Sequence, residues 1–218
     1  VTEFWTRLGA DERLYAKYKA VDVQTLNAEQ RKAHANALRS FVLSGAELQG
    51  AAKERFAAIQ ERSAALAQKF SENTLDATDR WAYYATAEEM QGLPADVQQA
   101  ARTAAQAEGK DGFKLTLKIP CYLPVMQFAT HSSLSEKLYR AYVTRASDQA
   151  EGDGQQYDNR PIIEEILALR HEEAQLLGYA NFGEVSLVPK MANSPQEVIT
   201  FLRDLAQRAR PYAEKDVQ

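Results

Sequence analysis

The residues best suited to metal chemistry lie in the stretch "HEEAQ" at positions 171–175. Two histidines four positions apart on a helix, with a glutamate directly after the first, bind zinc from one helix face, and the glutamate then acts as general base. Here the second position of this pattern holds Gln175 instead of histidine, and Leu167 stands one turn before His171. Because a neutral amide is a poor zinc ligand, we interpret His171 as a solvent-exposed helix residue.

Other reactive residue types do not form a complete site either. His34, His131 and His171 are far apart in the sequence, and no metal-ligand spacing connects them. Cys121 lies in the apolar stretch "IPCYLPVM" without a nearby base, which favours a packing role over nucleophilic chemistry. Adjacent glutamates point about 100° apart on a helix and cannot flank one bond together. These pairs are Glu88–Glu89, Glu164–Glu165 and Glu172–Glu173.

Phosphate-binding glycine motifs and the ligand pattern of a calcium loop are missing as well. We therefore assign no catalytic, cofactor-binding or metal-binding residue to this sequence.

The helix expected over residues 160–178 carries two charges in an unusual place. A helical wheel puts its apolar residues on one broad arc and places His171 and Gln175 opposite that arc. Arg170 and Glu173 fall inside the arc, and a charge on a buried stripe needs a partner. We predict that the two side chains pair with each other or bridge to a neighbouring element. The arc consists of Ile162, Ile163, Ile166, Leu167, Leu169, Ala174, Leu176 and Leu177.

Composition narrows the classes of protein to which the chain can belong. The 218 residues carry a net charge of −4, which does not provide the basic face that nucleic-acid binding needs. A single cysteine excludes an internal disulfide framework and fits a reducing compartment. We find neither a long apolar run nor a signal peptide. We therefore expect a cytoplasmic protein without nucleic-acid or membrane partners.

Helical periodicity dominates the rest of the chain and predicts the fold class. Aromatic and β-branched runs at 80–86 and 113–119, separated by a helical pattern at 94–108 and the turn "GKDG", predict a two-stranded β element. We expect a mainly α protein, a multi-helix array with this small β element. The remaining helices are predicted from Asn27 (with Gln30 completing a capping box) to about residue 44, over 47–76, from Ser133 (with Glu136 as its box partner), over 160–178, and from Ser194 onwards.

The polar, glycine-containing segment 146–160 is predicted to be a loop, and it could mark a boundary. The chain begins at Val1 directly before an amphipathic pattern and ends without a glycine-type helix stop. These ends lead us to expect a piece of a longer chain.

Five phrases, taken together and in order, resemble a known family. They are similar to the amino-terminal half of oligopeptidase A-like members of the thimet oligopeptidase family of zinc metallopeptidases. The resemblance covers essentially the whole chain. The phrases are "FSENTLDAT" (70–78), "IPCYLPVM" (119–126), "LYRAYVTRASDQ" (138–149), "YDNRPIIEEILALRHEEAQLLGY" (157–179) and "KMANSPQEVITFLRDLAQRARP" (190–211).

This resemblance implies a large helical enzyme whose two halves flank a deep channel for short peptides. The family holds zinc through an H-E-x-x-H helix and a further glutamate, and none of these residues is present in the chain. The resemblance therefore implies that this chain is a non-catalytic part that is inactive by itself. Peptide substrates, zinc and a carboxyl-terminal catalytic part are expected only in the intact enzyme. We assign residues 1–150 to the channel-wall half and residues 151–218 to the junction that leads to the catalytic part.

A second hypothesis stays open from the sequence. The chain could be a free-standing helical module that binds peptides or another protein without cleaving them. Peptide binding by the isolated chain, together with a reading frame that stops after Gln218, would favour this alternative.

Overall fold

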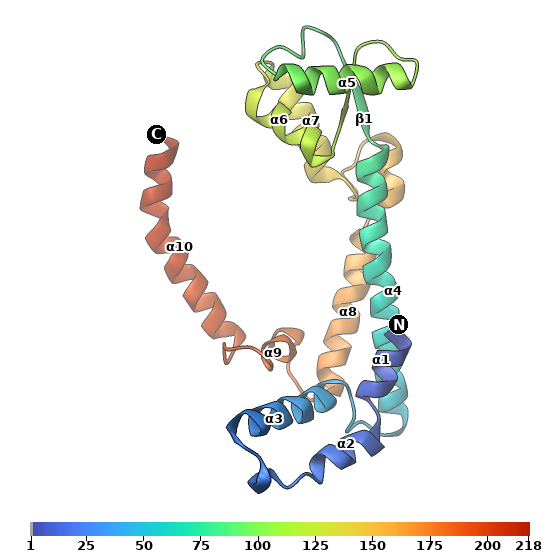
Figure 1. Ribbon diagram of the computed structural model, residues 1–218, viewed down its shortest axis with the longest axis vertical. Coiled ribbons are helices and arrows are strands. Elements are labelled where there is room, and N and C mark those ends of the chain that lie inside the picture. Colours follow the sequence, from blue (N-terminus) through green and yellow to red (C-terminus); the bar gives the residue numbers. More distant parts are fainter. Residues whose placement is uncertain (1) are drawn as a thin grey trace. The chain divides into compact units, whose positions relative to one another are not determined.

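The computed structural model describes residues 2–218 and is mainly helical (Figure 1). It contains one two-stranded sheet and two short 3₁₀ turns, at Val23–Thr25 and Gly152–Tyr157. The predicted fold class is thereby confirmed. The helices are α1 Thr2–Gly9, α2 Glu12–Lys19, α3 Ala28–Leu43, α4 Gly50–Arg80, α5 Ala95–Ala107, α6 Ile119–Phe128, α7 Ser132–Thr144, α8 Arg160–Leu176, α9 Phe182–Leu187 and α10 Pro195–Val217.

The chain divides into two compact units. Unit 1 combines residues up to Ala64 with Ile166–Gln218, and unit 2 comprises Ala65–Glu165. Helices α4 and α8 each contribute residues to both units. The division expected at residues 150 and 151 concerns the halves of a longer enzyme and stays a prediction. In the part of the chain that the structure describes, no helix is long and apolar enough to span a membrane.

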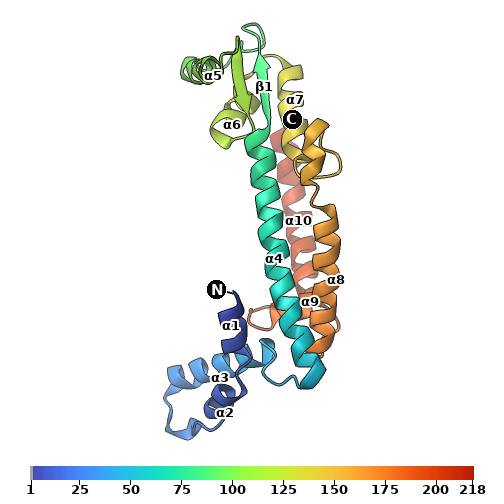
Figure 2. The same ribbon diagram turned by 90° about the vertical axis from the view of Figure 1, so that its right-hand side faces the viewer.

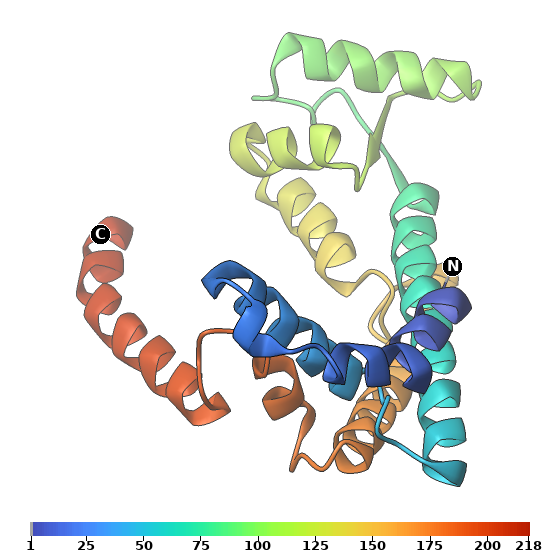
Figure 3. The ribbon, with the colours of Figure 1, turned by 60° about the horizontal axis from the view of Figure 1, so that its bottom comes forward.

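In unit 1, helices α2 and α3 pack against each other through aromatic rings (Figure 3). The Phe41 ring lies 5.6 Å from that of Tyr15 and 5.3 Å from that of Tyr18, measured between centroids. Helix α3 begins as predicted, because Asn27 and Gln30 form a complete capping box. This reciprocal bonding satisfies two backbone N–H groups that a helix start leaves without partners.

Also in unit 1, the first part of α4 lies beside the second part of α8 (Figure 2). Phe56 and Ile59 of the predicted α4 stripe are buried, and the stripe over 47–76 is confirmed in outline. Arg55 of α4 donates two hydrogen bonds of 2.6 Å to the carboxylate of Glu172 on α8. This exposed bidentate ion pair connects the two helices.

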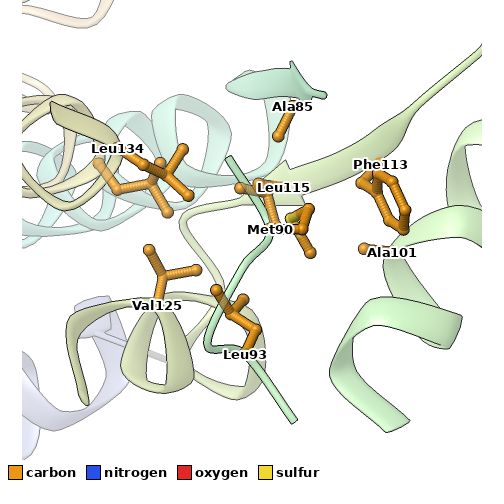
Figure 4. Packing of buried hydrophobic residues seen from close by; sticks show 9 residues of the cluster. Ala85, Met90, Leu93, Ala101, Phe113, Leu115, Val125 and Leu134 are labelled. Carbon is orange, nitrogen blue, oxygen red and sulfur yellow. The ribbon is translucent and has the colours of Figure 1, made fainter. Parts of the chain in front are cut away.

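Unit 2 is built around the predicted β element. Strand β1 (Ala82–Ala85) pairs antiparallel with β2 (Phe113–Thr116), with Tyr83 opposite Leu115. Leu115 is fully buried and lies between side chains from the sheet, the helices and the β1–α5 connection (Figure 4). Gly112 of the predicted turn has a φ of +89°, and a Cβ there would stand 2.6 Å from the Ala85 carbonyl oxygen. The core cluster consists of Ala85, Met90, Leu93, Ala101, Phe113, Leu115, Val125, Leu134 and Leu138.

One local feature differs from the sequence prediction, and one helix was not predicted. Helix α7 starts at Ser132 with His131 as its cap residue, so the predicted Ser133–Glu136 capping box is wrong. Glu136 instead pairs with Arg140 one turn further on, at 3.5 Å. The stretch "IPCYLPVM" forms most of helix α6, although it contains Pro120 and Pro124. Pro120 is tolerated because the first helical turn has no acceptor for its missing N–H group.

The fold predicts that alanine substitutions at two leucines of unit 2 change the free energy of unfolding by very different amounts. Leu115→Ala should lower the free energy of unfolding by about 2–5 kcal/mol, because it opens a cavity in a closed core. Leu75→Ala should change it by less than about 0.5 kcal/mol, since that side chain is 60% exposed. Urea denaturation followed by Trp81 fluorescence measures both. Equal losses for the two variants would contradict the assigned core.

Candidate functional site

His171 and Gln175 do not form part of a metal site in the structure. His171 is exposed on α8, as predicted. The Gln175 side chain donates hydrogen bonds of 3.2 and 3.1 Å to the carbonyl oxygens of Tyr179 and Ala180, so it closes the end of the helix. Gln175 therefore has a structural role at the carboxyl-terminal end of α8.

The other metal-ligand candidates stay apart. His34 Nε2 donates a 2.7 Å hydrogen bond to the Tyr18 carbonyl oxygen in unit 1, whereas His131 belongs to unit 2. Within residues 2–218, no group of three His, Cys, Asp or Glu side chains is arranged to hold a metal ion. Cys121 packs against the core of unit 2, and its Sγ accepts a 3.2 Å hydrogen bond from the Thr116 N–H, which confirms its packing role.

Arg170 and Glu173 both reach neighbouring elements, as predicted. The Arg170 guanidinium lies over the Phe182 ring of α9, 5.0 Å from its centroid. The Glu173 carboxylate is half-buried and hydrogen-bonded by the side chain of Gln60 on α4. Burial raises the pKa of Glu173, and the Gln60 hydrogen bond and the Arg170 charge offset only part of this shift. The helical wheel was wrong about part of the buried arc, because Ile163, Leu167 and Arg170 are all exposed.

Two adjacent glutamates therefore have opposite pKa shifts. Glu172 has a lowered pKa because Arg55 donates hydrogen bonds to its carboxylate. Its charge stabilises the fold above the ordinary pKa of 4.5, and this contribution is lost as the pH falls through the lowered value. Glu173 has the opposite effect on stability. Because burial disfavours its charged form, the fold loses stability as the pH rises above 4.5 and this carboxyl ionises in the unfolded state.

We predict opposite effects for the two matched substitutions. At neutral pH, Glu173→Gln should raise the melting temperature, since it removes a poorly solvated charge while an amide can still bond Gln60. Glu172→Gln should lower it, because the Arg55 ion pair is lost. Both differences should shrink as the pH falls and the two carboxylates become protonated, with Glu173 protonated at a higher pH than Glu172. Thermal unfolding monitored by circular dichroism tests this pair, and shifts of the same sign at neutral pH would refute the assignment.

A buried amide pair joins two distant segments of unit 2. Asn73 on α4 and Asn159 directly before α8 are only 4% and 2% exposed. The Asn73 Nδ2 group donates to Asn159 Oδ1 at 2.9 Å, and Asn159 Nδ2 donates to the Phe70 carbonyl oxygen at 3.0 Å. The backbone N–H of Asn159 donates to the Ala146 carbonyl oxygen at 3.0 Å. Asn159 thus binds α4 and the end of α7 at the same time.

Sequence reasoning did not single out either asparagine, although both occur in the matching phrases. Asn73 lies in "FSENTLDAT" and Asn159 in "YDNRP". The sequence did contain a sign of this buried pair, because Asn73 lies three residues after Phe70 and continues the apolar stripe of Leu66 and Phe70. A polar residue on an apolar stripe requires a hydrogen-bond partner. The segment 146–160, expected to be a boundary loop, lies inside unit 2, where Ala146 and Tyr157 are buried against Ala77.

Loss of either amide should destabilise unit 2 strongly. Asn73→Ala or Asn159→Ala should each cost about 1–3 kcal/mol, because the remaining buried amide loses its partner. The double variant should cost less than the sum of the two single variants. Gln68→Ala on the same helix is a matched control, since that amide is exposed and should matter by less than about 0.5 kcal/mol. Strict additivity in urea denaturation would show that the two side chains are not coupled.

A groove surrounds Trp81 at the junction of α4 and β1. Three shallow hollows share Trp81 and Glu151 among their lining residues. We call these hollows together the Trp81 groove. Trp81 is half-buried, and Glu151 is exposed. The wall of the groove comes from α4, β1, α7 and the loop 146–159, so the amide pair positions two of its sides.

The Trp81 groove contains charges of both signs. Glu151 and Asp153 line one part of it, and within residues 2–218 neither carboxylate has a hydrogen-bond or ion-pair partner. Lys137 and Arg140 of α7 line the adjoining part. The Lys137 ammonium lies 3.7 Å from the centroid of the Tyr83 ring, and Arg140 pairs with Glu136. The groove therefore carries two unpaired carboxylates beside Trp81, whereas the cations of α7 contact other side chains of the chain.

Known proteins with similar sequences indicate the family that this chain resembles. The model of peptidase family M3 matches residues 125–218. The chain is 46% identical over 222 residues to oligopeptidase A of Salmonella typhimurium and 42% identical over 223 residues to that of Haemophilus influenzae. Both alignments cover the whole chain. The resemblance to oligopeptidase A is confirmed.

The similarity extends to plants but covers only part of each relative. A probable cytosolic oligopeptidase A of Arabidopsis thaliana is 38% identical over 202 residues, or 87% of this chain. The chain spans 32% and 33% of the length of the two bacterial relatives and 28% of the plant relative. The structure described above therefore corresponds to about a third of an oligopeptidase A.

Proposed function

We propose that this chain is the amino-terminal, non-catalytic part of a zinc-dependent oligopeptidase of family M3 that hydrolyses short peptides in the cytoplasm. The observation that carries the proposal is the identity of 46% to an oligopeptidase A over every residue of the chain. An identity of this size, distributed over the full chain, supports a shared fold and a shared place in the larger enzyme. The name of the plant relative, a probable cytosolic oligopeptidase A, supports the proposed compartment.

The residues of this chain do not fit a zinc site. The side chains nearest to a zinc motif, His171 and Gln175, have no second histidine, and the described residues contain no group arranged for a metal ion. We therefore propose that any zinc of the intact enzyme is bound by residues outside this chain. We propose that the contribution of this chain is to build and position a wall of the enzyme.

The surface of α10 supports a place within a larger protein. Every side chain from Phe201 to Gln218 is exposed, although the helix carries several large apolar residues. Isolated apolar residues on a surface are ordinary, but a run of them along one helix is typical of a surface that another part covers. In the proposed enzyme, the carboxyl-terminal part covers it. The exposed large apolar residues of this run are Phe201, Leu202, Leu205, Tyr212 and Val217.

The proposal predicts a sharp contrast in activity. The complete protein should cleave a short unstructured peptide, lose this activity in a metal chelator and regain it with zinc. The 218-residue chain with the same peptide and zinc should remain at the uncatalysed rate, at least about 10⁶-fold slower. Peptide hydrolysis followed by chromatography measures both proteins.

Two results would overturn parts of the proposal separately. Turnover by the 218-residue chain would show that it contains catalytic residues. Full activity of the complete protein after thorough chelation would remove the metal dependence. A casein digestion run in parallel tests the size limit, because the proposed enzyme should leave a folded or long protein substrate intact.

A further inference from the structure

We propose that an exposed apolar patch of unit 2 is a surface on which the remainder of the enzyme, outside this chain, packs. The patch consists of Ile119 and Leu123 on α6 and of Tyr139 and Val143 on α7, and we call it the α6–α7 patch. The inference rests on the proposed function and deepens it, because it names side chains of unit 2 that join this chain to the rest of the protein.

Each of the two helices presents an apolar ridge to solvent. The exposed fractions are 53% for Ile119 and 46% for Leu123 on α6, and 56% for Tyr139 and 53% for Val143 on α7. The two residues on each helix are four positions apart, so they lie on the same helix face, one turn after the other. Large apolar side chains are thereby repeated along one exposed face of each helix.

Helices α6 and α7 pack side by side in opposite directions (Figure 1). The rings of Tyr122 and Tyr142 stack between them, with 4.1 Å between centroids and planes inclined by 16°. Ser135 Oγ donates a 3.4 Å hydrogen bond to the Val125 carbonyl oxygen. The later residue of α6 thus contacts the earlier residue of α7, so the helices are antiparallel and the tyrosine stack lies along their seam.

This register joins the two ridges into one patch. Counted from the stacked tyrosines, Leu123 lies level with Tyr139, and Ile119 lies level with Val143. Burial raises the pKa of Tyr122 in the seam, and the nearby Tyr139 hydroxyl contributes to the same shift. Tyr139 therefore lies at the seam, and the four exposed side chains surround it on both helices.

The chemistry of the patch suits another protein surface. The patch itself carries no charged side chain, and two neighbouring cations are already paired, Arg140 with Glu136 at 3.5 Å and Lys118 with Asp79 at 3.1 Å. An aliphatic and aromatic surface gains free energy when it is removed from water, and a tyrosine ring packs while its hydroxyl stays available for a hydrogen bond. A contiguous exposed patch of this kind is typical of a protein contact site.

Two observations favour the remainder of the enzyme as the occupant. The chain spans 32% of the length of its Salmonella relative, so most of such an enzyme lies outside this chain. The model of peptidase family M3 matches residues 125–218, so all of α7 belongs to the segment that this chain shares with the family. A ridge on that segment is therefore a surface that the rest of a family M3 protein can cover.

Thiol labelling of the complete protein tests the proposal. Val143→Cys places a thiol in the patch, and Gln99→Cys on the exposed side of α5 is the matched control. In the complete protein, we expect a maleimide to label position 143 at least about tenfold more slowly than position 99, because a covered thiol is inaccessible. In the 218-residue chain, the two rates should agree within about threefold. Tryptic peptides separate position 143 from Cys121, because trypsin cleaves after Arg140.

A charge placed in the patch gives an independent measurement. Leu123→Lys should lower the melting temperature of the complete protein by at least about 2 °C, because the new ammonium group would be buried in an apolar contact. It should change that of the 218-residue chain by less than about 1 °C. Leu75→Lys on α4 lies outside the patch and is the matched control, since Leu75 is also exposed and should have the same small effect in both proteins.

Equal labelling rates at positions 143 and 99 in the complete protein would overturn the proposal, and so would an effect of Leu123→Lys no larger than that of Leu75→Lys. Protection of position 143 in the 218-residue chain that increases with protein concentration would assign the patch to a second copy and would also overturn it. Neither measurement uses a peptide substrate or zinc. Their failure therefore leaves the proposed hydrolysis in place, and failure of the activity test leaves the contact surface in place.

Discussion

The arrangement of unit 2 depends on burying two amides where α4 passes the loop before α8. Desolvating an amide costs free energy unless its donors and acceptors are satisfied. Asn159 meets this requirement only when Asn73, the Phe70 carbonyl and the Ala146 carbonyl are all in place. This is a directional constraint, unlike apolar packing, and it fixes the register between α4 and the 146–159 loop. The loop in turn carries Glu151 and Asp153 to the groove.

Ala146 illustrates what this constraint imposes on the backbone. It is buried and has a φ of +54°, in the left-handed region that residues with a Cβ rarely occupy. Such a conformation costs about 1–3 kcal/mol and persists only where surrounding contacts determine it. The hydrogen bond from Asn159 to the Ala146 carbonyl is one of these contacts. A segment that reads as a polar linker is therefore an ordered part of unit 2.

The functional proposals rest on a division of tasks between this chain and the remainder of a longer enzyme. The chain contains no arrangement of side chains suited to metal-assisted hydrolysis within its described residues. What it does contain is a set of helices whose charged residues bridge elements, as Arg55 and Glu172 do, and a groove with charges of both signs. In the proposed enzyme, this chain positions structural elements while the chemistry resides in another part of the protein.

The sequence by itself determined the features that depend on local periodicity and capping. The 3.6-residue pattern, the Asn27 box and the Ser194 cap define their helices because these interactions join residues within a few positions. The alternating runs around Tyr83 and Leu115 likewise predicted the small sheet. Only the tertiary structure decided the partner of Asn73, the opposite environments of Glu172 and Glu173, and the meeting of Trp81 with Glu151. Those outcomes depend on contacts between residues far apart in the chain, as between Asn73 and Asn159, and on how much water each side chain keeps. Neither quantity is encoded in local spacing.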